Sequence, residues 1–94
     1  MKLSPTLLER TLNQYDAKAI PDGDPVVPQL TELFGDHTFF LDDGGLNIVE
    51  PAEPMQSGAQ TGRLVKLADW TAGKTGLSPH EPEPTDMVIV LEPH

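Results

Sequence analysis

Residues 38–49 read TFFLDDGGLNIV, and this stretch decides the fold. Two apolar runs flank an Asp-Asp-Gly-Gly loop, in which Gly44 and Gly45 can take the positive φ angles of a tight turn. A loop of two residues and a loop of four residues give the same register, with Leu41 opposite Leu46. The sequence therefore predicts an antiparallel β-hairpin.

Both faces of this hairpin carry apolar side chains. Because side chains alternate along a strand, the register places four apolar residues on one face: Phe39, Leu41, Leu46 and Ile48. The opposite face combines apolar and polar residues: Phe40, Val49, Thr38 and Asn47. We expect the first face to be core, whereas the second is not cleanly polar.

The length of 94 residues predicts a single domain, 1–94, with a modest core. About a quarter of the residues are Leu, Ile, Val or Phe, which is enough for the chain to fold. We expect no cofactor deep inside so small a domain.

Fifteen acidic residues against six basic ones give a net charge of −9. This charge disfavours nucleic acid and anionic lipid as partners, although an acidic surface could regulate a basic protein. There are no cysteines, so disulfides and thiolate chemistry are excluded. The sequence shows no apolar run long enough for a signal peptide or a membrane span, and we expect a soluble, cytoplasmic protein.

Two short helices are predicted before the hairpin. Ser4 is a good N-cap and Pro5 suits the first helical position, and apolar residues keep helical spacing as far as Ala19. The second helix ends near Gly35 and begins at Pro25 or, because a proline ring clashes further inside a helix, at Pro28.

Two further strands are predicted after the hairpin. Residues 63–70 favour a strand, although a short helix also fits, and residues 51–62 and 71–86 are expected to be loops. Residues 87–91 are apolar without alternation, which suggests an inner strand. The expected fold is an α+β domain with two short N-terminal helices packed on a mostly antiparallel four-stranded sheet, in the order α-α-β-β-β-β.

Two motifs suggest chemistry. Residues 68–75, ADWTAGKT, match a relaxed phosphate-binding loop, but a proline-rich segment follows where that loop requires a helix. His37 is predicted to face Glu50 across the open end of the hairpin, where the pair could act as a general base or bind a metal. Neutralising a strand end is the commoner role for such a pair.

A partner surface is predicted on the second face of the sheet. Two helices can cover one face, which would leave the other as an apolar patch with acidic surroundings. The residues expected there are Phe40, Val49, Leu64 and Trp70, with either Val88 or Val90. A polyproline segment would add His80 and Glu83 on one edge, although a stiff solvated connector explains it as well.

The leading hypothesis is a non-catalytic module that uses this face to bind a protein partner or a second copy of itself. The alternative is a small enzyme or metal-binding protein centred on His37 and Glu50. The predicted patch would be lost if the helices lay on opposite faces or if the loops folded over it.

Overall fold

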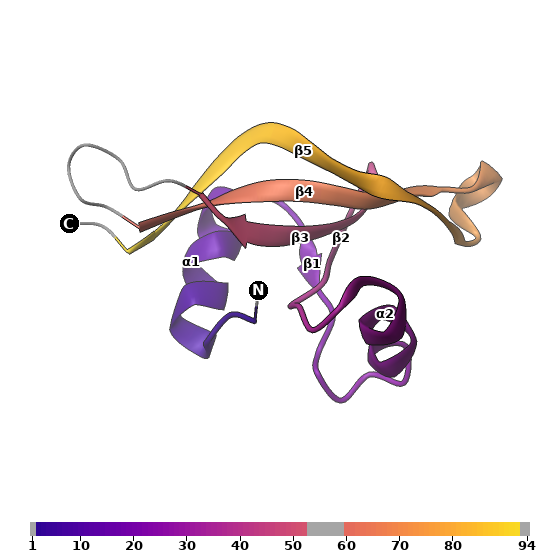
Figure 1. Ribbon diagram of the computed structural model, residues 1–94, viewed down its shortest axis with the longest axis horizontal. Coiled ribbons are helices and arrows are strands. Elements are labelled where there is room, and N and C mark those ends of the chain that lie inside the picture. The colour runs from indigo at the N-terminus through magenta and orange to yellow at the C-terminus, as the bar shows by residue number, and fades with distance from the viewer. Residues whose placement is uncertain (1, 53–59, 93–94) are drawn as a thin grey trace.

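The computed structural model describes residues 2–52 and 60–92 and confirms an α+β fold. Figure 1 shows two helices beside one antiparallel sheet. The helices are α1 (Pro5–Gln14) and α2 (Val27–Phe34), with a single 3-10 turn, η1 (Ala72–Lys74). The strands are β1 (Lys18–Ala19), β2 (Phe40–Asp42), β3 (Gly45–Pro51), β4 (Gln60–Trp70) and β5 (Leu77–Glu92). They neighbour one another in chain order, and β1 is an addition to the four predicted strands.

The hairpin of β2 and β3 has the predicted register, with Leu41 opposite Leu46. Its turn is held by the Asp42 carboxylate, whose Oδ1 accepts hydrogen bonds from the backbone N–H of Gly44 at 2.7 Å and of Gly45 at 2.9 Å. Gly45 has φ +136°, a conformation that residues with a side chain rarely adopt. The Asp-Gly turn predicted from the sequence therefore closes the hairpin.

Both helices begin close to the predicted residues. The Ser4 hydroxyl accepts a hydrogen bond from the backbone N–H of Leu7 at 3.3 Å, as expected of an N-cap. α2 begins at Val27, between the two predicted starts. The prediction that the first helix continues to Ala19 is wrong, because Tyr15 is extended and the following residues pair with β2 as strand β1.

The helices lie on opposite faces of the sheet, and the expectation that both cover one face is wrong. In Figure 1, α1 passes behind the strands and α2 lies near the other end of the molecule. α1 packs on a cluster containing Tyr15, Phe40, Val49, Leu64, Ile89 and Leu91. α2 packs on a second cluster containing Leu30, Phe39, Leu46, Ile48, Val65, Leu67 and Ala68. Each face of the hairpin therefore belongs to a core of its own, and the two sets of hairpin residues are divided as predicted.

Residues 63–70 form a strand, β4, but the prediction of a loop over 71–86 is wrong for most of its length. β5 begins at Leu77 and follows β4 to Glu92. It is the edge strand of the sheet, so the predicted inner position is also wrong. Its prolines are compatible with this place, because an edge strand needs fewer backbone donors. Two of the irregularities in the pairing with β4 lie next to Pro84 and Pro79. The predicted loop over 51–62 falls largely on residues 53–59, which lie outside the described residues.

The edge of β5 is tied to α1 by side-chain hydrogen bonds. Gln14 donates from Nε2 to the carbonyl of Val90 at 2.7 Å, and its Oε1 accepts from the N–H of Val90 at 2.8 Å. Arg10 donates to the carbonyl of Leu91 at 2.7 Å. α1 thus satisfies backbone groups of the outer strand in addition to covering the sheet. In the described part of the chain, no helix has the length and apolarity needed to cross a membrane.

Candidate functional site

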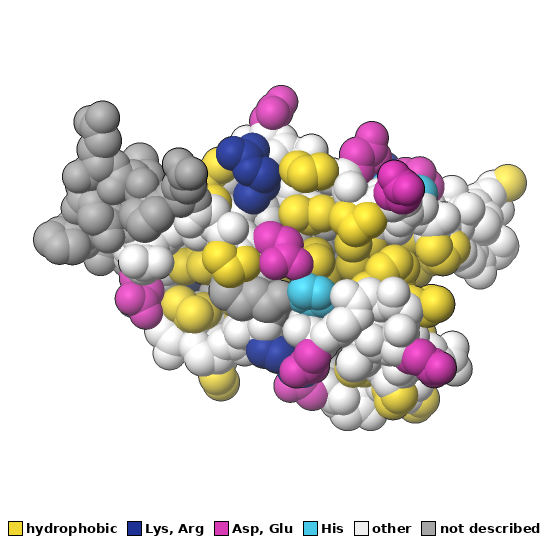
Figure 2. Space-filling model, in the orientation of Figure 1, with side chains coloured by type: hydrophobic (Ala, Val, Ile, Leu, Met, Phe, Trp, Pro, Cys, Tyr) yellow, Lys and Arg dark blue, Asp and Glu magenta, His cyan; other side chains and the backbone are white. Residues whose placement is uncertain are grey.

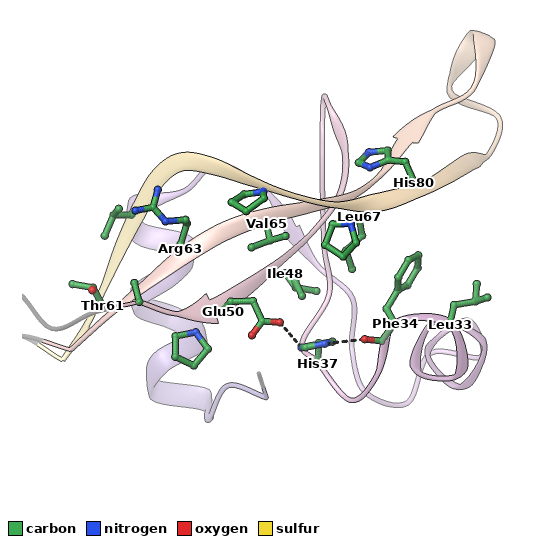
Figure 3. Close-up of a pocket in the computed structure, with 15 residues that line it drawn as sticks. Leu33, Phe34, His37, Ile48, Glu50, Thr61, Arg63, Val65, Leu67 and His80 are labelled. Carbon is green, nitrogen blue, oxygen red and sulfur yellow. Dashed lines mark hydrogen bonds and ion pairs between the residues drawn. The ribbon is translucent and has the colours of Figure 1, made fainter.

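A hollow of about 1060 Å³ lies on the face of the sheet that α2 only partly covers. Figure 3 shows its lining, which comes from the end of α2, the loop that follows it, and strands β3, β4 and β5. The hollow exists because α2 is only eight residues long and packs at one end of the sheet. The rest of that face is left without a helix.

The floor of the hollow follows from the strand register. Ile48 of β3 pairs with Val65 of β4, which pairs with Pro84 of β5, and these residues form an apolar row across three strands. The next row is mixed, since Glu50 pairs with Arg63, and Arg63 with Val88. Both rows line the hollow, which therefore combines an apolar floor with one charged end.

Exposed apolar side chains border the hollow. Leu33 on the last turn of α2 is 66% exposed, and Val88 on β5 is 43% exposed. Figure 2 looks onto this face and shows hydrophobic side chains gathered across the sheet, with acidic side chains and a histidine around them. An apolar hollow with a polar border is typical of a binding site.

The predicted contact between His37 and Glu50 is present at the rim of this hollow. His37 Nδ1 lies 3.6 Å from Glu50 Oε1, and His37 Nε2 lies 3.0 Å from the carbonyl oxygen of Phe34 (Figure 3). A carbonyl can only accept a hydrogen bond, so Nε2 carries a proton. Nε2 is thus hydrogen-bonded to the end of α2, and Nδ1 faces the Glu50 carboxylate on β3.

His80 also lines the hollow, as a residue of β5. Its Nδ1 lies 2.7 Å from the carbonyl oxygen of Glu81, and its Nε2 lies 3.4 Å from a carboxylate oxygen of Asp69 without making a hydrogen bond. Glu83, which the sequence placed on the same edge, is exposed on β5 opposite Lys66 and does not line the hollow. The structure therefore brings only the first of these two predicted residues to the site.

The remaining residues predicted for a partner surface lie elsewhere. Phe40 and Val49 are fully buried and Leu64 is 4% exposed, because α1 packs against them. Trp70 is half-buried, and its Nε1 donates to the backbone carbonyl of Asp42 at 2.6 Å. The face that the sequence predicted as an apolar surface is therefore covered by α1. The hollow lies on the other face, and its residue Val65 was not among those predicted for a partner surface, whereas Val88 was an open choice. The spacing of Val65 and Leu67 was a usable signal, but only the position of α2 distinguishes the two faces.

A second polar cluster connects α1 to the hairpin turn. The Tyr15 hydroxyl donates to the Asp42 carboxylate, and Asn47 Nδ2 donates to both groups at 3.0 Å. Burial, followed by the Asp42 carboxylate, raises the pKa of Tyr15 far above its usual value of 10.0. Every one of these polar groups is hydrogen-bonded to another, and we assign the cluster a structural role.

Within residues 2–52 and 60–92, no group of three or more His, Cys, Asp or Glu side chains is arranged to hold a metal ion. Segment 68–75, which resembles a phosphate-binding loop in sequence, spans the end of β4 and η1, and leads into an antiparallel strand. Comparison of the chain with models of protein families, with curated proteins and with solved structures found no match.

Proposed function

We propose that this protein is a non-catalytic binding module, and that it holds an apolar segment of a partner protein in the hollow beside α2. The observation that carries the proposal is the hollow of about 1060 Å³ with Ile48 and Val65 in its floor. Its volume is at the upper end of the range of about 300–1,000 Å³ for ligand pockets. Several side chains of a partner segment therefore fit.

The exposed apolar border supports the same proposal. Leu33 and Val88 stand on two different elements, α2 and β5, on either side of the hollow. Covering the exposed part of one such side chain stabilises a complex by about 0.6–2 kcal/mol, which corresponds to about three- to thirtyfold in affinity. A partner that fills the hollow covers both.

The test is a selection of displayed random peptides on the native protein, followed by binding to variants. Leu33→Asp and Val88→Asp are expected to weaken the selected peptides by at least about tenfold, because each places a charge on the apolar border. Leu12→Asp and Met87→Asp are the matched controls, since these residues are 36% and 37% exposed and do not line the hollow. Peptides that bind all four variants equally would place binding outside the hollow and contradict the proposal.

A second copy of the chain is the other protein occupant, and sedimentation of the same variants distinguishes it. If the protein dimerises, and if Leu33→Asp but not Leu12→Asp yields a monomer, the occupant is another copy. A native protein that stays monomeric at all concentrations while binding selected peptides favours a different protein as the partner.

The alternative of an enzyme or a metal-binding protein rests on the contact between His37 and Glu50. Against it stands the Phe34 carbonyl, which occupies His37 Nε2, while Nδ1 faces the Glu50 carboxylate. A general base needs a ring nitrogen directed at its substrate. Titration with divalent metals, observed through the histidine NMR signals, discriminates the two: a saturable shift of the His37 signals supports the alternative.

A further inference from the structure

Apart from Glu50, the acidic side chains around the hollow lie outside its lining (Figure 2). β5 contains four acidic residues and neither Lys nor Arg: Glu81, Glu83, Asp86 and Glu92. On the opposite side, α2 and the loop after it add Glu32 and Asp36. Lys2 Nζ bonds to Asp22 and lies 3.8 Å from Asp36. The surroundings of the hollow are therefore more acidic than its lining, in which Glu50 pairs with Arg63.

The end of α2 adds to this negative potential. Leu33 and Phe34 belong to its last turn and line the hollow, and this turn contains no basic residue. The C-terminal end of a helix carries a partial negative charge that a cation stabilises. Here His37 supplies a hydrogen bond to the Phe34 carbonyl, but no lysine or arginine of α2 supplies a charge.

Glu50 places a carboxylate at the rim itself. Its side chain is 40% exposed, and its Oε1 lies 3.6 Å from His37 Nδ1. Arg63 is the one lysine or arginine that lines the hollow, and its Nη1 donates to the carbonyl of Thr85 on β5 at 2.8 Å. One guanidinium thus balances Glu50 within the lining, whereas the acidic residues of β5 and α2 lie around it.

We infer that the occupant of the hollow is a protein segment that carries Lys or Arg beside its apolar side chains, an inference that rests on the binding function proposed above. The apolar residues of this segment cover Ile48 and Val65, and its cations lie toward Glu50 and the end of α2. The apolar floor disfavours a simple inorganic cation, since an ion gains nothing from covering Ile48 and Val65. The acidic surroundings of the hollow disfavour an acidic segment.

The test uses three synthetic peptide pools of the same design. Each has apolar residues at alternate positions, and the positions between them carry Lys in the first pool, Gln in the second and Glu in the third. Binding is measured by fluorescence polarisation, and the NMR signals of Val65 and Val88 locate it. The Lys pool is expected to bind at least about tenfold more tightly than the Glu pool at low salt, and the ratio should shrink at high salt.

Glu50→Gln and Glu9→Gln separate the charge of the hollow from the net charge of the protein. Both variants remove one exposed carboxylate, but Glu9 lies on α1, on the other face of the sheet. We expect Glu50→Gln to lower the ratio of Lys-pool to Glu-pool affinity about threefold, and Glu9→Gln to leave it unchanged. An equal fall in both variants would overturn the inference.

The outcomes also distinguish this inference from the proposed function. If all three pools shift Val65 and Val88 with equal affinity, the hollow binds peptides without preference for charge, and only the inference fails. If no pool shifts these residues, the proposed function fails and the inference fails with it.

Discussion

Tyr15 provides the sharpest test of the described structure, because it is the only tyrosine of the chain. Its side chain is 6% exposed, and its hydroxyl lies between the Asp42 carboxylate and the Asn47 amide. Removing its proton would place two negative charges in hydrogen-bonding contact at a buried position. Burial and the Asp42 carboxylate accordingly raise the pKa of Tyr15 far above 10.0.

The sign of the pH effect follows from this shift. In the unfolded chain Tyr15 loses its proton above about pH 10, whereas the folded protein keeps it, so the folded state binds more protons at higher pH. The stability is therefore fully present below about pH 10 and falls as the pH rises, by about 1.4 kcal/mol per pH unit. Between about pH 10 and pH 12 the loss from this one group is about 3 kcal/mol.

Urea unfolding of the wild type and of Tyr15→Phe measures this contribution. At about pH 8 the variant should be less stable by about 2 kcal/mol, because it loses the hydroxyl that bonds to a carboxylate but keeps the ring. This difference should vanish between about pH 11 and pH 12, since only the wild type loses about 1.4 kcal/mol per pH unit at that position. The effect of lysine titration on stability cancels in this comparison, because the lysines titrate in both proteins.

Tyrosinate absorbance gives an independent measurement, because it reports Tyr15 alone. The native protein should show no tyrosinate until it unfolds. Ionisation of the folded protein with a midpoint near pH 10, or stability curves of the two proteins that stay parallel up to about pH 12, would refute the assignment of a buried Tyr15 hydroxyl bound to Asp42.

Two further predictions concern the turn and the sheet edge. Gly45→Ala should destabilise the protein by at least about 3 kcal/mol, because a Cβ would lie 2.0 Å from the carbonyl oxygen of Ala68 and the backbone has φ +136°. Gly23→Ala, where no atom lies within 4 Å, is its control, and equal urea midpoints for the two variants would contradict the turn geometry. Gln14→Ala should cost about 1–2 kcal/mol and speed hydrogen exchange of the Val90 amide, since it removes both side-chain bonds to that residue. An unchanged exchange rate at Val90 would show that Gln14 does not hold this edge.

The parts of the fold that local chemistry determines could be predicted from the sequence. The hairpin register depends on a glycine-containing turn and on alternation, and both can be read over a few residues. The N-cap at Ser4 is similarly local. The contact between His37 and Glu50 was predictable for the same reason, since it follows from the hairpin register.

The parts that depend on tertiary placement could not be predicted in this way. Which face a helix covers depends on where the chain turns after it, and α1 ends at Gln14 because Tyr15 bonds to Asp42 far along the chain. The length of β5 was missed because Pro82 and Pro84 read as loop residues, although an edge strand tolerates them. The hollow is the result of both placements, so no local pattern indicates it.

The long edge strand β5 also affects how this protein avoids aggregation. An open strand edge is a template on which other chains can add, and cross-β fibrils grow in this way. Along β5, prolines lack the N–H that an incoming strand would need. Near the end of β5, the side-chain amide of Gln14 is hydrogen-bonded to both the N–H and the carbonyl of Val90. A chain shortened to begin after Gln14 would lose this cover and should form fibrils more readily than the intact protein.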